Sequence, residues 1–411
     1  MKVVIGMVIS ALACPALGQD LVLQNATVID GTGAPPSDGV TVVIRGGRIA
    51  SVGAAEAPAA GARTIDLGGR FLLPGLIDAH THILDPASAL RALQSGVTSA
   101  RVLGDEYLQA MGTRDLIRSG HLEGPELLCS GGHVRPRLGT PFMVTFPQFG
   151  RYLREKLSGA ENVSAVVRAL LERGVDVIKV GASERAGLAA TDPRRQELNE
   201  EEIRAAVREA AREGKFVAAH AHDEAGAEAA VRGGVRSIEH GTYLNDRTLA
   251  LMKEQGTFLV PTLAIMSPMA DPQTDAASDI SLRIRTWHMQ PALRAVVRKA
   301  HGMGIPIAAA TDGGYGDGDD TARVRVQHDV EQLVEVGLTP LEALSAATSN
   351  GARVLGIEER TGTIAVDREA DLIVLDRNPL QDLRALFEPL LVVTDGRVVF
   401  DRLYPNPYAG R

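Results

Sequence analysis

The sequence is poor in several features that mark other classes of protein. Its 411 residues include only two cysteines, Cys14 and Cys129, which excludes a scaffold held together by disulfides. Basic residues number 43 against 51 acidic ones, and the net charge of −8 offers nucleic acid no positive field. Aromatic residues make up only 4%, and no apolar run is long enough to span a bilayer. What remains is a globular chain with room for one large domain and a smaller one.

The first 18 residues have the character of a secretory signal. A short positive start and an apolar segment lead to a small-x-small cleavage site at residues 16–18. We therefore expect an exported protein, periplasmic or secreted. The alternative is a lipoprotein anchored through Cys14, although the residues before Cys14 fit that motif poorly. Either way Cys129 has no partner, and we expect it to be a small core residue.

Short strand patterns occupy both ends of the mature chain. Residues 19–73 and 356–411 contain brief apolar strands separated by turn signals such as Asp30-Gly31. Because chain ends often lie close together, we expect these segments to form one composite β-sandwich domain. The central domain, residues 74–355, is then inserted between them.

The central domain alternates strand and helix patterns. Strands are predicted at 76–82, 98–103, 126–130, 176–180, 216–220, 237–240, 257–262 and 305–310. The clearest helix patterns are 162–172, 200–213, 224–232, 291–302, 323–336 and 340–348. Eight such units in about 280 residues predict a (β/α)8 TIM barrel, whose active site lies at the C-terminal strand ends. The alternative, a doubly wound open sheet, would carry a Gly-rich turn after its first strand, where this chain has His80-Thr81-His82.

Side chains able to bind metal fall at five predicted strand ends. They are His80, His82, Lys179, His220, His222, His240 and Asp312. His80 and His82 are two residues apart on a strand, so both imidazoles point the same way. His222 shares a face with His220, and it is either an alternative ligand or a contact for substrate.

Lys179 lies within an apolar strand, Val177-Ile178-Lys179-Val180. Burial disfavours its charged form, so the pKa of the amine should fall. A neutral lysine can add carbon dioxide and become a carbamate, an anionic ligand able to bridge two metal ions. The alternative is a buried lysine paired with Asp312.

These residues carry a resemblance to the amidohydrolase superfamily. The motif Pro-Gly-Leu-Ile-Asp-x-His-x-His at 74–82, Lys179 in the fourth strand, residues 238–241 and residues 311–312 all resemble that superfamily. Residues 130–133 and 240–243 are similar to its imidazolonepropionase-like and Xaa-Pro dipeptidase branch, which includes prolidases and ochratoxin-hydrolysing amidases.

The resemblance implies two divalent metal ions, most simply zinc, about 3.5–4 Å apart with an activated hydroxide between them. The ligands implied are His80, His82 and Asp312 for the more buried ion, His220 and His240 for the more exposed ion, and carboxylated Lys179 for both. Asp312 would also carry the proton from the attacking water to the leaving amine.

Other residues near the strand ends are candidates for contact with the substrate. Tyr243 and His133 could assist catalysis or bind substrate, and the alternative for each is a packed loop residue. Arg135 could pair with a substrate carboxylate, although loop arginines are mostly solvated. Asp78 is expected to support the ring of His80, and the Pro- and Gly-rich segment 134–156 could cover the site.

The function favoured by these residues is hydrolysis of an amide bond. The expected substrate is a small molecule, a dipeptide or an N-acyl amino acid with a free carboxylate, such as an Xaa-Pro dipeptide or an ochratoxin-type amide. The alternatives are a cyclic-amide hydrolase of the imidazolonepropionase kind, a mononuclear deaminase using Glu224, and a non-catalytic scaffold. No nucleic acid and no membrane span are expected, and the resemblance implies a homo-oligomer.

Overall fold

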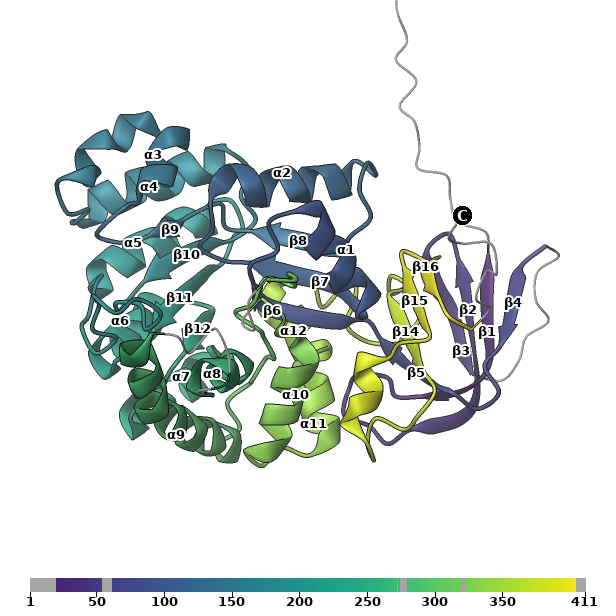
Figure 1. The fold of residues 1–411 in the computed structure, drawn as a ribbon. Helices are drawn as coiled ribbons and strands as arrows, with labels where there is room; N and C mark the ends of the chain where they lie inside the picture. The colour runs from purple at the N-terminus through teal and green to yellow at the C-terminus, as the bar shows by residue number, and fades with distance from the viewer. Residues whose placement is uncertain (1–19, 54–60, 272, 274–278, 319–321, 404–411) are drawn as a thin grey trace, which may run out of the picture.

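The computed structural model describes residues 20–53, 61–271, 273, 279–318 and 322–403. The predicted signal and Cys14 lie outside these residues. The chain forms a large body of strands and helices with a smaller β-rich part beside it (Figure 1). Within the described part of the chain, no helix combines the length and the apolar character needed to cross a membrane.

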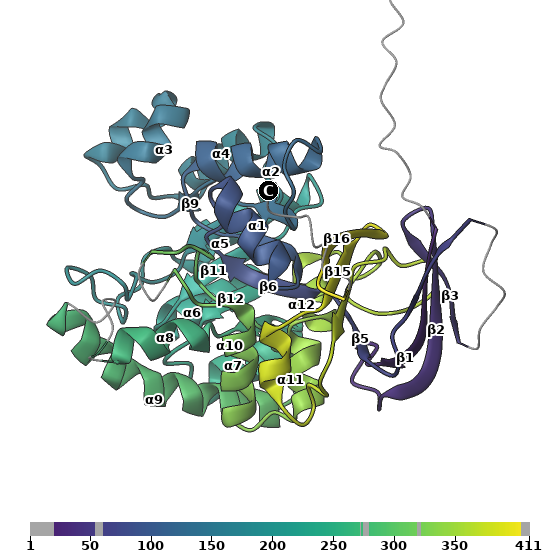
Figure 2. The same cartoon turned by 45° about the vertical axis from the view of Figure 1, so that its right-hand side comes forward.

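Strands from both ends of the chain share one eight-stranded sheet. They are β1 (Leu21–Val28), β2 (Ser37–Arg45), β3 (Arg48–Gly53), β4 (Arg63–Asp66), β5 (Phe71–Pro74), β14 (Leu372–Leu375), β15 (Leu391–Thr394) and β16 (Arg397–Asp401). The order is β16-β15-β14-β5-β1-β2-β3, with β4 paired to β1. The antiparallel pairing of β5 with β14 joins the two ends, and Leu72 and Leu372 are fully buried beside it. The sheet is hydrogen-bonded without a break from β16 to β3. Figure 2 shows that it lies to one side of the helices.

The central part contains two parallel sheets. One has the order β6-β7-β8 and the other β13-β12-β11-β10-β9. The strands are β6 (Leu76–Thr81), β7 (Val97–Val102), β8 (Glu126–Cys129), β9 (His133–Val134), β10 (Ile178–Gly181), β11 (Val217–Ala221), β12 (Ser237–His240) and β13 (Phe258–Val260). Seven of the eight predicted strand positions are therefore confirmed, and β9 is an additional short strand.

The predicted strand at 305–310 is not a regular strand, although its backbone is bonded on both sides. Ala308 N donates to Leu259 O of β13 at 3.0 Å, and Ala79 N of β6 donates to Ala309 O at 3.1 Å. On the opposite side of the sheets, Asp176 N donates to Cys129 O of β8 at 2.9 Å. The two sheets are thus connected by backbone hydrogen bonds at both of their edges.

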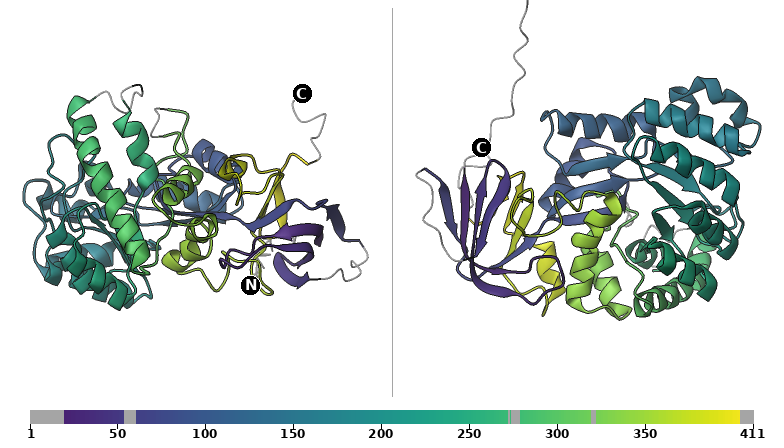
Figure 3. Two further views of the ribbon diagram at one scale, coloured as in Figure 1. Left: turned by 90° about the horizontal axis from the view of Figure 1, so that it is seen from below. Right: turned by 180° about the vertical axis from the view of Figure 1, so that it is seen from behind.

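Helices surround the strands, as Figure 3 shows from below and from behind. They are α1 (Pro86–Gln94), α2 (Tyr107–Arg118), α3 (Thr140–Thr145), α4 (Ala160–Glu172), α5 (Glu200–Ala211), α6 (Glu224–Gly233), α7 (Asp246–Gln255), α8 (Leu263–Ala270), α9 (Ile280–Gly302), α10 (Val326–Glu335), α11 (Pro340–Ala346) and α12 (Ser349–Leu355), with 3-10 helices η1 (Pro147–Leu153) and η3 (Leu383–Phe387). The expected start of α9 at Pro291 is wrong, because this proline lies inside the helix.

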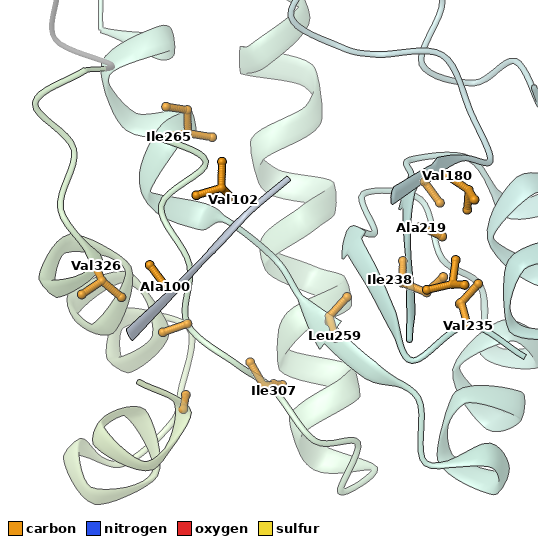
Figure 4. Close-up of a cluster of buried hydrophobic side chains, with 14 of the residues drawn as sticks. Ala100, Val102, Val180, Ala219, Val235, Ile238, Leu259, Ile265, Ile307 and Val326 are labelled. Carbon is orange, nitrogen blue, oxygen red and sulfur yellow. The ribbon is translucent and has the colours of Figure 1, made fainter. Parts of the chain in front are cut away.

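The core lies between the strands and these helices. Figure 4 shows Val180, Ala219, Val235 and Ile238 gathered on that outer side of β10, β11 and β12. Because successive residues of a strand point to opposite faces, the neighbours of these residues point into the space that the strands enclose. Those neighbours are Lys179, His220 and Glu239. Cys129 is free and buried, as expected of a small core residue.

Candidate metal centre

The predicted ligand residues come together at one end of the parallel strands. The registers of β10, β11 and β12 place His220 and His240 at adjoining strand ends. Asp312 reaches them because its backbone N–H donates to His80 O at 2.7 Å. His240 and Asp312 have left-handed backbones, with φ of 70° and 53°. Such a conformation is costly for residues other than glycine and is found most often at functional sites.

His80, His82 and Asp312 form one set of possible ligands, here called the Asp312 group. Their ligand atoms all lie within 4.8 Å of one another. Asp312 Oδ1 is 3.2 Å from His80 Nε2 and 3.0 Å from His82 Nε2. Burial alone would raise the pKa of Asp312, but His80, His82 and His240 bring it below its usual range. Asp312 is therefore an anion placed between two imidazoles.

His220, His222 and His240 form the second set, here called the three-histidine group. Their ligand atoms also lie within 4.8 Å of one another, and all three side chains are buried. Burial, followed by repulsion from His240, lowers the pKa of His220 and His222 well below its ordinary value. Burial, with His80 and Lys179 acting in the same direction, lowers the pKa of His240 to about 3. Neutral imidazoles at this spacing are the form in which histidine binds metal. His222 thus lies with His220 and His240 rather than apart from them.

Lys179 lies within electrostatic reach of both groups. Burial is the main cause that lowers the pKa of its amine to about 8, and Asp312 and Glu239 oppose the change. Its charge in turn helps to lower the pKa of His80 and of the histidines in the second group. The Nζ atom is buried without a hydrogen-bond partner, and no ion pair joins it to Asp312 in the described residues. The alternative of a simple Lys179–Asp312 pair is therefore wrong.

The imidazoles of the two groups are supported by different kinds of side chain. In the Asp312 group, His80 Nδ1 lies 2.9 Å from Glu239 Oε2, and His82 Nδ1 lies 2.7 Å from Asp105 Oδ2. In the three-histidine group, the supports are hydroxyls. His222 Nδ1 is 2.9 Å from Thr242 Oγ1, and His240 Nδ1 is 2.8 Å from Thr262 Oγ1.

Asp78 supports His80 through the backbone rather than through the ring, because its Oδ1 accepts from His80 N at 3.2 Å. The Asp78 carboxylate accepts hydrogen bonds from the Thr311 backbone and hydroxyl and from the Tyr315 hydroxyl, so it anchors the segment that leads to Asp312. The residue on the His80 ring is Glu239, which is itself paired with fully buried Arg101. A single charged residue, Arg101, in the buried strand β7 and a glutamate just before His240 were the available signals.

A basic cluster lies beside the three-histidine group. The rings of His133 and His220 are 6.1 Å apart, and His133 Nε2 is buried without a partner. Arg135 is not solvated as its loop position suggested, because its Nη2 donates to Glu197 Oε1 at 2.6 Å. Arg185, which the sequence reasoning missed, has no hydrogen bond or ion pair from its guanidinium among the described residues. Arg185 is exposed to solvent. Partial desolvation and the charge of Arg135 lower its pKa, while Glu197 and Asp312 oppose the change.

Tyr243 follows β12, is partly buried, and has Arg194, Asp192 and Arg285 as its charged neighbours. Its backbone N–H donates to His222 O at 2.8 Å, which fixes the loop against the three-histidine group. Burial raises the pKa of its phenol, so the hydroxyl stays protonated and able to donate. Glu224, the base required by a deaminase, is exposed at the start of α6 and accepts from Asn245 instead.

Comparison with known proteins is consistent with this geometry. The family model described as "Amidohydrolase family" matches residues 71–399. Ochratoxinase from Aspergillus niger is 32% identical over 370 residues, covering 78% of this chain and 73% of the relative. Imidazolonepropionase from a Polaromonas species is 25% identical, covering 97% of each chain. A solved Xaa-Pro dipeptidase with bound methionine superposes with a TM-score of 0.81 at 27% identity, covering 92% of this chain and 99% of that one.

Proposed function

This chain belongs to the amidohydrolase family and is a hydrolase of amide bonds; on that premise we propose a binuclear metal-dependent enzyme acting on a dipeptide or an N-acyl amino acid. The observation that carries the proposal is the position of Lys179. Its buried amine has no partner and is coupled to two separate sets of metal-competent side chains.

The residues present fit a pair of divalent cations, most simply zinc. The donors are imidazoles and one carboxylate, which suit zinc, and the unpartnered atoms Lys179 Nζ and His220 Nε2 are buried among them. We assign His80, His82 and Asp312 to one ion, and His220 and His240 to the other. His222 is left as a contact for substrate. Bound ions would polarise the scissile carbonyl and lower the pKa of an attacking water.

Lys179 would join the two positions as a carbamate. A pKa of about 8 leaves part of the amine neutral at ordinary pH. The neutral amine adds carbon dioxide, forming a nitrogen–carbon bond and releasing one proton. The resulting anion offers two oxygens in place of one nitrogen, and it removes the cost of a cation among neutral histidines.

Asp312 is the residue placed to move the proton during hydrolysis. Both of its contacts with histidine are made by Oδ1, which leaves Oδ2 to accept a proton from water and pass it to the leaving amine. We propose that Tyr243 donates to the carbonyl oxygen through its hydroxyl, which burial keeps protonated. His133 is proposed to contact the substrate beside His220.

The basic cluster supports a substrate with a free carboxylate. Arg135 and Arg185 carry two positive charges against the single carboxylate of Glu197. A guanidinium with no protein partner can bind a carboxylate through two hydrogen bonds. We therefore propose Arg185 as the main anchor, with Arg135 held in place by Glu197.

A second candidate is hydrolysis of a cyclic amide. It is favoured by the match to an imidazolonepropionase over 97% of the chain. The deaminase alternative has no support from the position of Glu224, and a scaffold would not have kept every ligand. Linear N-acyl amino acids release a free amino acid, whereas a cyclic amide opens without releasing one, so product analysis separates the two candidates.

Several broader features belong to the same proposal. The two parallel sheets with segment 305–313 are proposed to make a (β/α)8 barrel at residues 74–355. Residues 19–73 and 356–411 would make the composite β-sandwich domain. We also propose export through the signal at 1–18, with lipid anchoring at Cys14 as the alternative, and assembly into a homo-oligomer.

The experiment that tests the function combines metal analysis with a substrate screen. Purified full-length protein should contain nearly two equivalents of zinc and release amino acids from N-acyl amino acids or dipeptides. Chelation should abolish this activity and zinc should restore it. Lys179→Met should lose both the second metal and the activity, whereas Lys253→Met, at an exposed lysine of α7, should keep both. A chelated protein with undiminished turnover would contradict the proposal.

A further inference from the structure

The supports behind the histidines differ between the two ligand groups, and this difference has a consequence for metal affinity. We propose that the Asp312 group binds its ion more tightly than the three-histidine group, because carboxylates support its histidines while only hydroxyls support the others. The inference rests on the proposed metal-dependent function, and it makes Glu239 and Asp105 positioning residues of the centre.

A carboxylate behind a histidine fixes the form of the ring. Asp105 only accepts hydrogen bonds when ionised, so His82 carries a proton on Nδ1. Glu239 Oε2 lies 2.9 Å from His80 Nδ1 without hydrogen-bond geometry, and it acts on that ring through its charge. Nε2 is then the ligand atom, and it faces Asp312 in both rings, so a bound cation would replace the proton that His82 Nε2 donates to Asp312. The ring needs no tautomeric change or rotation when a cation binds. Such carboxylate–histidine arrangements also make the ligand nitrogen more basic.

Glu239 is itself held rigidly in a fully buried position. Its Oε1 accepts from Arg101 Nη2 at 2.9 Å and from Ser237 Oγ at 2.5 Å. Arg101 Nε in turn donates to Ala79 O, in the residue before His80, at 2.7 Å. Arg101 therefore connects β12, which carries Glu239, to the strand that carries His80. This connection fixes the direction from which the carboxylate approaches the ring.

The three-histidine group has no such supports. The hydroxyl of Thr262 can either donate or accept, so it does not dictate which nitrogen of the ligand His240 carries the proton. The Thr242 hydroxyl leaves the tautomer of His222, the proposed substrate contact, equally open. A hydroxyl also adds no negative charge. His220 Nε2 has no partner at all in the described structure.

The charges around the two groups favour the same order of metal affinity as the hydrogen-bond geometry does. The Asp312 group and its supports contain three carboxylates, from Asp312, Asp105 and Glu239, against the one guanidinium of Arg101. The three-histidine group contains no ionised ligand of its own. A divalent cation is therefore attracted more strongly to the first position, and removal of a supporting carboxylate should lower affinity there by about 10- to 100-fold.

The test is a titration of metal-free, full-length protein with Co²⁺ in the presence of a competing chelator. We expect two binding steps of unequal affinity. Asp105→Asn and Glu239→Gln should each weaken the tighter step by about 10- to 100-fold. The matched controls Thr262→Val and Thr242→Val should leave the tighter step unchanged. Thermal unfolding of the metal-free variants checks that each one is folded.

Asp105→Asn keeps the inference testable if Glu239→Gln fails to fold, because Asp105 lies at the edge of the site against the partly exposed ring of His82. Two steps of equal affinity would overturn the inference and leave the proposed function standing. The same holds if the threonine variants weaken the tighter step as much as Asp105→Asn does. A wild-type protein that binds no Co²⁺ and hydrolyses no amide would overturn the proposed function as well.

Discussion

Replacement of Arg101 by methionine would leave the Glu239 carboxylate buried without its guanidinium partner. The two side chains are only 2% and 0% exposed, and their ion pair spans 2.9 Å. Removing one member of a buried pair typically costs about 3–5 kcal/mol, because the remaining charge is neither solvated nor neutralised. The variant also loses the hydrogen bond from Arg101 Nε to Ala79 O. We therefore expect the free energy of unfolding to fall by about 3–5 kcal/mol.

Urea unfolding of metal-free protein measures this loss. The double variant Arg101→Met with Glu239→Gln should recover part of it, since no uncompensated charge remains. Arg208→Met, at an exposed position of α5, is the control and should change stability by no more than about 0.5 kcal/mol. If Arg101→Met behaved like this control, the argument that Arg101 holds a charged Glu239 would be refuted.

Three further changes have defined outcomes. Asp312→Asn should lower kcat by about 10²- to 10⁴-fold with folding intact, because the proton acceptor is lost; steady-state kinetics on an N-acyl amino acid would show it. Arg185→Ala should raise KM by about 10- to 100-fold for substrates with a free carboxylate, and an equal effect on the corresponding carboxamides would refute the anchor. Burial raises the pKa of Asp371 to about 7, so folding favours the protonated form of this carboxyl. The stability that protonated Asp371 contributes is therefore fully present below its ordinary pKa, and it is lost as pH rises from about 4 through 7. Asp371→Asn should remove that part of the pH dependence in urea unfolding, and an unchanged profile would contradict the assignment.

The positions of the ligands could be predicted because their signals are local. His80, His220 and His240 each lie at the end of a predicted strand, and parallel strands bring such ends together. Lys179 could be recognised from its apolar neighbours alone, and its buried, unpartnered amine agrees with that expectation.

The supports of the ligand rings could not be predicted, since they depend on contacts between distant segments. Arg101 and Glu239 meet only because β7 and β12 face each other across the enclosed space. Asp78 could be recognised as a partner of His80 and does accept from its backbone N–H, whereas the carboxylate beside the ring comes from the distant Glu239. The segment at 305–310 has a strand's sequence but not its regular ladder. Arg135 has the sequence context of a solvated loop residue, and its contact with Glu197, 62 residues further along the chain, is seen only in the fold.

The most direct test of the central claim is anomalous diffraction at the zinc edge from crystals of the full-length protein. The account predicts two peaks, one at the Asp312 group and one at the three-histidine group, with density extending from Lys179 Nζ between them. A single peak, peaks elsewhere in the molecule, or an unmodified Lys179 beside two ions would contradict it.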